Sequence, residues 1–195
     1  KMIPLESDFS KRVFYHIDFL REKAGNKSKA VVHTHNNFPT GVGIASSASG
    51  FAALTVATSS ALGLDLSERE LSEIARLGSG SACRSIPSGF CEWIAEDDNN
   101  HSYAIQIAPP EHWDIRIVTV VVSKLPKQLS STSGHSLAAA SPFFKARLES
   151  LAMRLDTVRS AILKRDFEKF GHETEMEAIS FHSIAMTSPI QSEHG

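Results

Sequence analysis

The hydrophobic positions of the chain follow two periods, which predicts a mixture of helices and strands. Apolar residues at helical spacing, with charges between them, predict helices over 8–24, 51–64, 67–77, 141–164 and 166–182. Short runs of apolar and β-branched residues predict strands over 30–35, 89–94, 103–108 and 115–122. We expect the run 115–122 to form a central strand, because a strand buried on both faces has a nearly continuous apolar sequence.

Local signals refine two of these elements. Ser67 and Glu70 have the spacing of a capping box, which places a helix start at this point. We expect residues 89–94 to form a buried strand with Trp93 in the core. A turn over 97–101 then leads to the returning strand.

Composition and charge exclude several classes of function. The chain has 195 residues, of which 42% are hydrophobic, and this is enough for one domain of good size or two small ones. The net charge of -2 gives no reason to expect a nucleic acid or an anionic membrane as a partner. No apolar run is long enough to span a membrane. Two cysteines do not make a disulfide framework, so we expect a reduced, cytoplasmic setting.

The histidines and cysteines do not indicate a metal site. The nine histidines are scattered without zinc spacing, so we expect no metal ion held by protein side chains alone. His33 and His35 fall on one side of a predicted strand, where exposure or packing is a simpler interpretation than a ligand pair. His182 is interpreted as a core or helix-packing residue, with a catalytic role as the alternative. Cys83 and Cys91 are interpreted as buried bystanders, with reactive thiols as the alternative.

The most distinctive stretch is a turn rich in glycine and serine that leads into the second predicted helix. It reads Asn-Asn-Phe-Pro-Thr-Gly-Val-Gly-Ile-Ala-Ser-Ser-Ala-Ser-Gly over 36–50. Glycines let a backbone approach a ligand closely, and a helix N-terminus offers unpaired N–H groups to an anion. The pattern predicts a phosphate-binding loop; a tight turn before a buried helix is the alternative. The candidate ligand-binding residues are Gly43, Ala45, Ser46, Ser47 and Ser49.

A second stretch of small residues contains a fixed cation. Residues 77–85 read Leu-Gly-Ser-Gly-Ser-Ala-Cys-Arg-Ser. Arg84 offers a planar fork of donors that matches a carboxylate or a phosphate, and Ser79 and Ser81 lie close to it in the sequence. With a phosphate loop upstream, this pattern predicts an anion site for a substrate; a surface or ion-paired arginine is the alternative.

A third stretch of hydroxyl and cationic residues follows the run 115–122. It contains serines, a threonine and two lysines, and the end of a central strand is a suitable place for a ligand site. The candidate anion-binding residues are Lys124, Lys127 and Ser131. A solvated loop is the alternative.

Together, the three stretches resemble the signatures of the mevalonate diphosphate decarboxylase family, within the GHMP kinase superfamily. Residues 36–50 resemble that family's loop, Asn-Asn-Phe-Pro-Thr-x-x-Gly-Ile/Leu-Ala-Ser-Ser-Ala-x-Gly. Residues 78–85 resemble its Gly-Ser-Gly-Ser-Ala-x-Arg-Ser run, and residues 121–135 resemble its Val-Val-Ser…Lys…Ser-Ser-x-x-Gly-Met run. The resemblance extends from about Asp8 to Ile190.

The resemblance implies an α+β protein with the GHMP kinase fold. Residues 1–110 would be part of the N-terminal ribosomal-S5-domain-2-like domain, with the phosphate loop at 36–50. Residues 111–195 would begin a ferredoxin-like C-terminal domain. The family's N-terminal lysine region and its Asp-x-Gly-Pro-Asn-like motif do not occur in this chain. We therefore expect a fragment that lacks both ends.

The resemblance also implies an activity and a role for each candidate residue. The activity is ATP-dependent decarboxylation of mevalonate 5-diphosphate to isopentenyl diphosphate, with ATP and Mg²⁺ as cofactors and a homodimer as the assembly. The glycine-serine loop, with Lys124 and Lys127, would contact the phosphates of ATP. Arg84 would be the catalytic residue that holds the substrate carboxylate and 3-oxygen. The other substrate contacts would be Ser79, Ser81 and Ser131.

Two departures from the family pattern leave the number of substrate phosphates open. Many members have an arginine near Thr132, and most have methionine where His135 stands. The alternatives to the main interpretation are a phosphomevalonate or bisphosphomevalonate decarboxylase, a mevalonate 3-kinase and a non-catalytic GHMP-like module.

Overall fold

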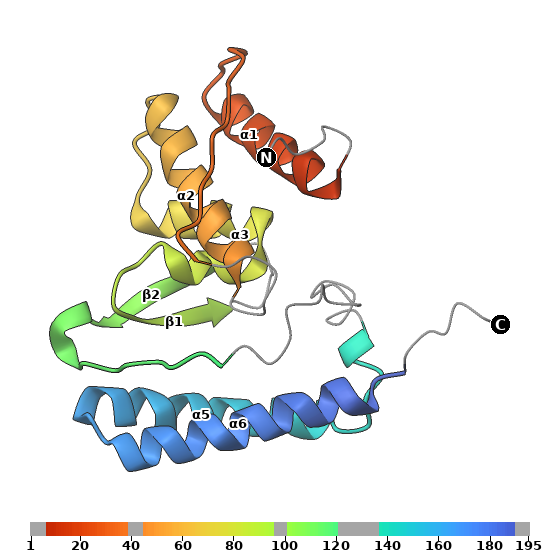
Figure 1. Ribbon diagram of the computed structural model, residues 1–195, viewed down its shortest axis with the longest axis vertical. Helices are drawn as coiled ribbons and strands as arrows, with labels where there is room; N and C mark the ends of the chain where they lie inside the picture. The colour runs from red at the N-terminus through yellow and green to blue at the C-terminus, as the bar shows by residue number, and fades with distance from the viewer. Residues whose placement is uncertain (1–6, 39–44, 96–100, 121–136, 190–195) are drawn as a thin grey trace. The chain divides into compact units, whose positions relative to one another are not determined.

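The computed structural model describes residues 7–38, 45–95, 101–120 and 137–189. The chain divides into two compact units, Lys1–His112 with Ile117–Lys124 and Trp113–Arg116 with Leu125–Gly195. Figure 1 labels the main helices and strands and colours the chain by residue number, from red at the N-terminus to blue at the C-terminus. The domain boundary between residues 110 and 111 stays a prediction.

The first unit contains three helices, a two-stranded antiparallel sheet and two short 3-10 helices. The strands pair with a register shift after Phe90, and they form the one sheet of the described ranges. The elements are α1 (Asp8–Lys23), α2 (Ser46–Ala61), α3 (Glu68–Gly78), η1 (Gly80–Ser85), β1 (Phe90–Ala95), β2 (Ser102–Ala108) and η2 (Pro110–His112).

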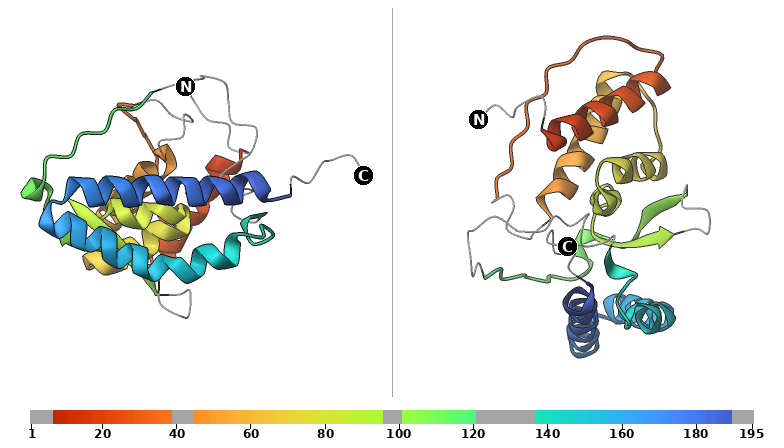
Figure 2. Two further views of the ribbon diagram at one scale, coloured as in Figure 1. Left: turned by 90° about the horizontal axis from the view of Figure 1, so that it is seen from below. Right: turned by 90° about the vertical axis from the view of Figure 1, so that its right-hand side faces the viewer.

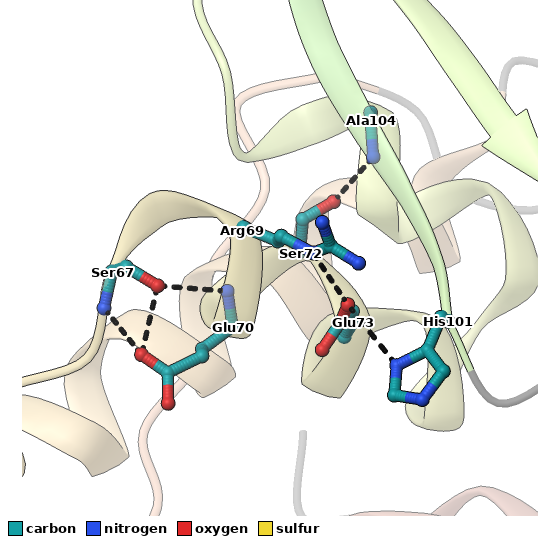
Figure 3. Close-up of polar contacts among 7 residues, drawn as sticks. All are labelled: Ser67, Arg69, Glu70, Ser72, Glu73, His101 and Ala104. Carbon is teal, nitrogen blue, oxygen red and sulfur yellow. Dashed lines mark hydrogen bonds and ion pairs between the residues drawn. The ribbon is translucent and has the colours of Figure 1, made fainter.

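Side-chain caps fix the starts of α1 and α3. At α1, the N–H of Ser10 donates to Ser7 Oγ at 3.2 Å. The predicted capping box at α3 is confirmed, since the N–H of Glu70 donates to Ser67 Oγ and the N–H of Ser67 donates to Glu70 Oε2 (Figure 3). These bonds satisfy N–H groups that have no partner within the helix.

The core of the first unit lies where α2 and α3 meet η1. Phe51 is 1% exposed and is the largest of the fully buried side chains. Small residues surround it, so that the backbones of the three elements approach closely. The buried cluster contains Ala48, Phe51, Ala75 and Ala82, with half-buried Val13, Leu54 and Ile86 packed against it.

Two long helices make up most of the described part of the second unit, α5 (Phe144–Lys164) and α6 (Phe167–Thr187). Figure 2 shows them side by side in both views. Across the pair, Arg147 forms an ion pair with Glu177. The indole ring of Trp113 contacts the rings of Phe167 and Phe170 near one end of α6.

The predicted helices are confirmed in place, although several of their ends differ. α2 begins at Ser46 and not at the predicted residue 51. Ser46, Ser47 and Ser49 therefore belong to the helix and not to the turn before it. α6 continues to Thr187, beyond the predicted end at residue 182. Within the described ranges, no helix combines the length and the apolar character that a membrane span requires.

Two of the four predicted strands form, at Phe90–Ala95 and Ser102–Ala108. The prediction that the first of these is buried is wrong, because its residues are half-buried or exposed. Trp93 is 38% exposed and so is not the core residue that was expected. The predicted turn at 97–101 lies outside the described residues except for His101.

The other two predicted strands do not form in the described residues. The segment 30–35 has no regular secondary structure, and Val31 is 83% exposed. Residues 115–120 are also irregular, with Ile117 and Val118 each 87% exposed, so the prediction of a buried central strand is wrong here. A strand requires hydrogen bonds to a neighbour, and neither segment pairs with the sheet formed by β1 and β2.

Candidate active site

The start of α2 has the features of an anion-binding helix terminus. Ala45 is the N-cap residue, with φ 54° and ψ 41° in the left-handed region, which is uncommon for a residue other than glycine. Its methyl side chain caps nothing, and the first turn contains no acidic residue. The helix therefore presents its positive end without a carboxylate that would compete with a bound anion.

The hydroxyl of Ser47 joins this helix start to the end of α3. Its Oγ lies 3.1 Å from the Oγ of Ser79, which is 32 residues further along the chain. Ser47 is exposed and Ser79 is half-buried, so the pair faces solvent. Ser49, one turn into the helix, instead donates to the carbonyl of Ser46 at 3.1 Å. The structure thus brings together two of the three sequence stretches, 36–50 and 77–85.

Close packing holds the segment that carries Ser79. Gly78, the last residue of α3, is buried, and a Cβ placed on it would lie 2.1 Å from Cδ1 of Phe51. A side chain at this position would clash with the aromatic ring, so only glycine allows α3 to end here. Ser79 itself is extended and connects α3 to η1.

The buried hydroxyl of Ser72 connects η1 with β2. Ser72, on α3, is fully buried; its Oγ donates to the carbonyl of Cys83 at 3.0 Å and accepts from the N–H of Ala104 at 2.8 Å. Figure 3 shows Ser72 reaching from α3 to Ala104 on β2. Because Cys83 directly precedes Arg84, this hydroxyl helps to set the position of the cation.

Arg84 is exposed at the end of η1, where its guanidinium can meet a ligand. Its Cζ lies 5.8 Å from the ring centroid of Trp93 on β1. Gly80 lies against the same ring, since a Cβ there would be 3.6 Å from Cη2 of Trp93. An aromatic ring restricts the position of a guanidinium that lies over it, and the guanidinium keeps its charge. Ser81 is half-buried in the same short helix.

The two cysteines are poorly suited to act as nucleophiles. Burial raises the pKa of the Cys83 thiol, and this outweighs the opposing effect of the neighbouring Arg84. Burial also raises the pKa of the Cys91 thiol. Both side chains therefore stay protonated at neutral pH, and a protonated thiol is a weak nucleophile.

Four of the predicted site residues lie outside the described residues: Gly43, Lys124, Lys127 and Ser131. Those that are described form one neighbourhood around the start of α2 and η1. In the described part of the chain, no group of three or more histidine, cysteine or acidic side chains could hold a metal ion. His33 and His35 are exposed in the irregular segment, and His182 is exposed on α6 with its ring against Phe181.

The sequence reasoning missed two residues that shape this neighbourhood. Trp93 was expected in the core and instead supports the Arg84 guanidinium. Gly78 was visible only as part of a glycine-serine run, although its contact with Phe51 explains why that residue must be glycine. Neither contact has a signal in the sequence, because both join segments that are distant along the chain.

Comparison with known proteins identifies both parts of the chain. A family model described as "Diphosphomevalonate decarboxylase-like N-terminal domain" matches residues 3–104. A second, described as "Mevalonate 5-diphosphate decarboxylase C-terminal domain", matches residues 117–191. The diphosphomevalonate decarboxylase of Saccharomyces cerevisiae is 42% identical over 165 residues, covering 82% of this chain and 42% of the yeast protein.

Solved structures agree with these matches. A crystal structure of mevalonate diphosphate decarboxylase from Staphylococcus aureus has a TM-score of 0.84 at 31% identity, covering 94% of this chain and 56% of that one. The protein MDDEF, in complex with MVAPP, AMPPCP and magnesium, has a TM-score of 0.80 at 33% identity, covering 92% of this chain and 55% of that one.

The chain thus spans about half the length of the relatives and structures that it matches. The structural matches confirm the prediction of an α+β, GHMP kinase fold. Since the N-terminal model alone matches residues 3–104 of 195, the chain belongs to the diphosphomevalonate decarboxylase family.

Proposed function

We propose that the protein to which this chain belongs is a carboxy-lyase that converts mevalonate 5-diphosphate to isopentenyl diphosphate in an ATP-dependent reaction. The observation that carries the proposal is the 3.1 Å pairing of Ser47 with Ser79, which joins a helix N-terminus to the segment bearing Arg84. An anion site for a nucleotide and one for an acidic substrate would then be neighbours. The names of the matched relatives support the same reaction.

The start of α2 fits the phosphates of ATP. Its N-cap residue Ala45 leaves the helix end without a side-chain cap, and the hydroxyls of Ser46 and Ser47 lie in the first turn. We assign the nucleotide contacts to these residues together with Gly43, Ser49, Lys124 and Lys127. Bound ATP with Mg²⁺ would supply the phosphoryl group for the substrate's 3-hydroxyl; magnesium and the ATP analogue AMPPCP are named with MDDEF.

The segment from Ser79 to Arg84 fits an acidic, phosphorylated substrate. The guanidinium of Arg84 would bind the carboxylate in a bidentate manner and orient it relative to the 3-oxygen. The hydroxyls of Ser79 and Ser81, with Ser131 from the third stretch, would contact the carboxylate region or the phosphate tail.

The chemistry explains why fixed donors matter at this site. Loss of a phosphate from a tertiary carbon develops positive charge next to anionic groups, and loss of carbon dioxide follows. Donors that hold the carboxylate and the leaving oxygen in fixed positions stabilise that charge distribution without reorganising. Arg84 on the Trp93 ring and Ser79 against Ser47 are held in place before substrate arrives.

Four substrates distinguish this proposal from its alternatives. The full-length protein is incubated with ATP and Mg²⁺ and, separately, with mevalonate, its 5-phosphate, its 5-diphosphate and its 3,5-bisphosphate, while ADP and carbon dioxide are measured together. Both products from the 5-diphosphate are expected. Both products from the 5-phosphate instead would indicate the shorter substrate that the sequence at Thr132 and His135 leaves open.

The remaining outcomes contradict the proposal in defined ways. ADP without carbon dioxide identifies a kinase, such as a mevalonate 3-kinase. Release of carbon dioxide from the 3,5-bisphosphate without ADP would show that the loop over 36–50 does not bind ATP for this reaction. No product from any substrate favours a non-catalytic module. We further propose that the protein acts as a cytoplasmic homodimer, which light scattering and fluorescence localisation of the full-length protein would test.

A further inference from the structure

We propose that Arg12, on α1, is a positioning residue that fixes Ser79 in the geometry required for its pairing with Ser47. This inference rests on the proposed function, in which that pair belongs to the anion site. Arg12 donates a hydrogen bond to the carbonyl of Gly78. It acts through the peptide group that immediately precedes Ser79.

One side chain of α1 joins the two helices that form the site. The Nη2 of Arg12 donates a hydrogen bond to the carbonyl oxygen of Gly78, the last residue of α3. The same guanidinium lies over the ring of Phe51 on α2, with 5.0 Å between Cζ and the ring centroid. This hydrogen bond is a direct link between α1 and the end of α3.

The hydrogen-bonded carbonyl belongs to the peptide unit that leads into Ser79. The peptide unit is planar and rigid, so the carbonyl of Gly78 and the N–H of Ser79 move together. That N–H donates to the carbonyl of Ala75 at 3.2 Å. The peptide is therefore held from both sides, by Arg12 at its oxygen and by Ala75 at its nitrogen. Its orientation determines the direction in which the Ser79 side chain leaves the backbone.

The packing around Gly78 makes the position of the peptide between Gly78 and Ser79 sensitive to the loss of Arg12. Gly78 lies so close to Phe51 that a Cβ would be 2.1 Å from Cδ1 of the ring, so the backbone is closely packed against this side chain of α2. Movement of the peptide away from Phe51 would break the bond to Arg12. The charge is also well placed, because a cation near the C-terminus of a helix interacts favourably with its unpaired carbonyls. Lysine could not stack on the ring and donate to the carbonyl with the same planar group.

The test compares four variants of the full-length protein: Arg12→Ala, Ser79→Ala, the double variant and Lys11→Ala. Lys11 precedes Arg12 on α1, is exposed as Arg12 is, and carries the same charge, so its variant is the matched control. We expect Arg12→Ala to lower kcat about tenfold, with KM for the substrate changing less than about twofold, since misplacement affects the reacting geometry more than binding. Lys11→Ala should match the parent protein.

The double variant shows whether Arg12 acts through Ser79. We expect Arg12→Ala to have little further effect once Ser79 is alanine, because residues that act through one another are non-additive. Multiplied losses in the double variant would overturn the proposal, and so would an unchanged kcat in Arg12→Ala.

Backbone hydrogen exchange gives a readout that does not depend on turnover. The N–H of Ser79 and that of Ala82, which donates to the Ser79 carbonyl at 2.8 Å, should exchange about tenfold faster in Arg12→Ala. The N–H of Leu64, at the far end of α2, should not change. Equal exchange at Ser79 in both proteins overturns the inference. A parent protein that is inactive on every substrate overturns the proposed function instead, and exchange alone then decides the role of Arg12.

Discussion

The junction of α2, α3 and η1 and the pair formed by α5 and α6 are held together by different means. At the junction, glycine and alanine allow close backbone approach, and buried hydroxyls connect segments far apart in sequence. Ser72 is an example, since it joins α3 both to η1 and to β2. In the helix pair, ion pairs connect the two helices, with Arg147 and Arg154 of α5 both close to Glu177 of α6.

The two regions also differ in how much apolar surface they cover. Phe51 at the junction is 1% exposed, whereas Ile179 on α6 is 63% exposed and Met153 on α5 is 69% exposed. Close packing has little tolerance for a change in shape, and long charged side chains have much more. The candidate site therefore lies in the region whose geometry is the more tightly determined. Equivalent substitutions in the two regions should therefore have unequal effects.

The largest effect is expected from Arg84→Leu. Loss of the guanidinium should lower kcat/KM at least about 100-fold, because the substrate carboxylate loses a charged, bidentate partner. Arg84 is exposed, and its contact with Trp93 should contribute less than about 1 kcal/mol to stability. The control, Arg116→Leu in the second unit, removes an equally charged and 84% exposed side chain. Steady-state assays and denaturation of both variants check this, and near-normal turnover in Arg84→Leu would contradict the site.

Alanine at two glycines should have opposite effects on stability. Gly78→Ala at the junction should lower the free energy of unfolding by about 1–3 kcal/mol, because the new methyl group overpacks against Phe51. Gly171→Ala, within α6, should raise it by about 0.5–1 kcal/mol, since no atom lies within 4 Å of the new Cβ and alanine favours the helix. Urea denaturation measures both; the same sign for the two changes would remove the contrast between the regions.

The loss of stability on removing a serine hydroxyl should also depend on the region. Ser72→Ala leaves the carbonyl of Cys83 and the N–H of Ala104 buried without this partner, which should cost about 1–3 kcal/mol. Ser150→Ala in α5 removes only a bond to the carbonyl three residues earlier and should change stability by less than about 0.5 kcal/mol. Comparable losses in chemical denaturation would show that Ser72 has no special role.

Local sequence signals were sufficient to predict the helices and to single out the stretches 36–50 and 77–85 as candidates for the site. The capping box at Ser67 and Glu70 depends on residues three apart and is confirmed. The contact of Ser47 with Ser79 joins these two stretches, and the sequence did not predict it. The roles of these residues in catalysis stay predictions.

Features that depend on distant partners could not be predicted in the same way. A β-branched run such as 115–120 has strand propensity, but it becomes a strand only when another segment pairs with it, and the described residues provide none. The alternation around Trp93 does not indicate which face of the strand is covered. Similarly, nothing in α1 itself shows that Arg12 meets the last carbonyl of α3.

A buried histidine makes the junction sensitive to acid. His16 on α1 is 1% exposed, and its Nε2 lies 2.8 Å from Oγ1 of Thr55 on α2. Because that hydroxyl donates to the carbonyl of Phe51 at 2.7 Å, it accepts from His16, whose Nε2 therefore carries a proton. Nδ1 is buried and has no hydrogen-bond partner within the described part of the chain. A second proton would have no acceptor there.

The smallest effect is expected from the pH dependence that this histidine causes. Burial lowers the pKa of His16 from 6.5 to about 4, so between these values the unfolded chain binds a proton that the folded chain does not. Its contribution to stability should therefore be complete above pH 6.5 and decrease as the pH falls toward 4. Urea midpoints between pH 7 and 4.5 should decrease less steeply in His16→Gln than in the parent protein. His172→Gln, at an exposed position on α6, should keep the parent slope, and equal slopes in all three proteins would contradict the assignment to His16.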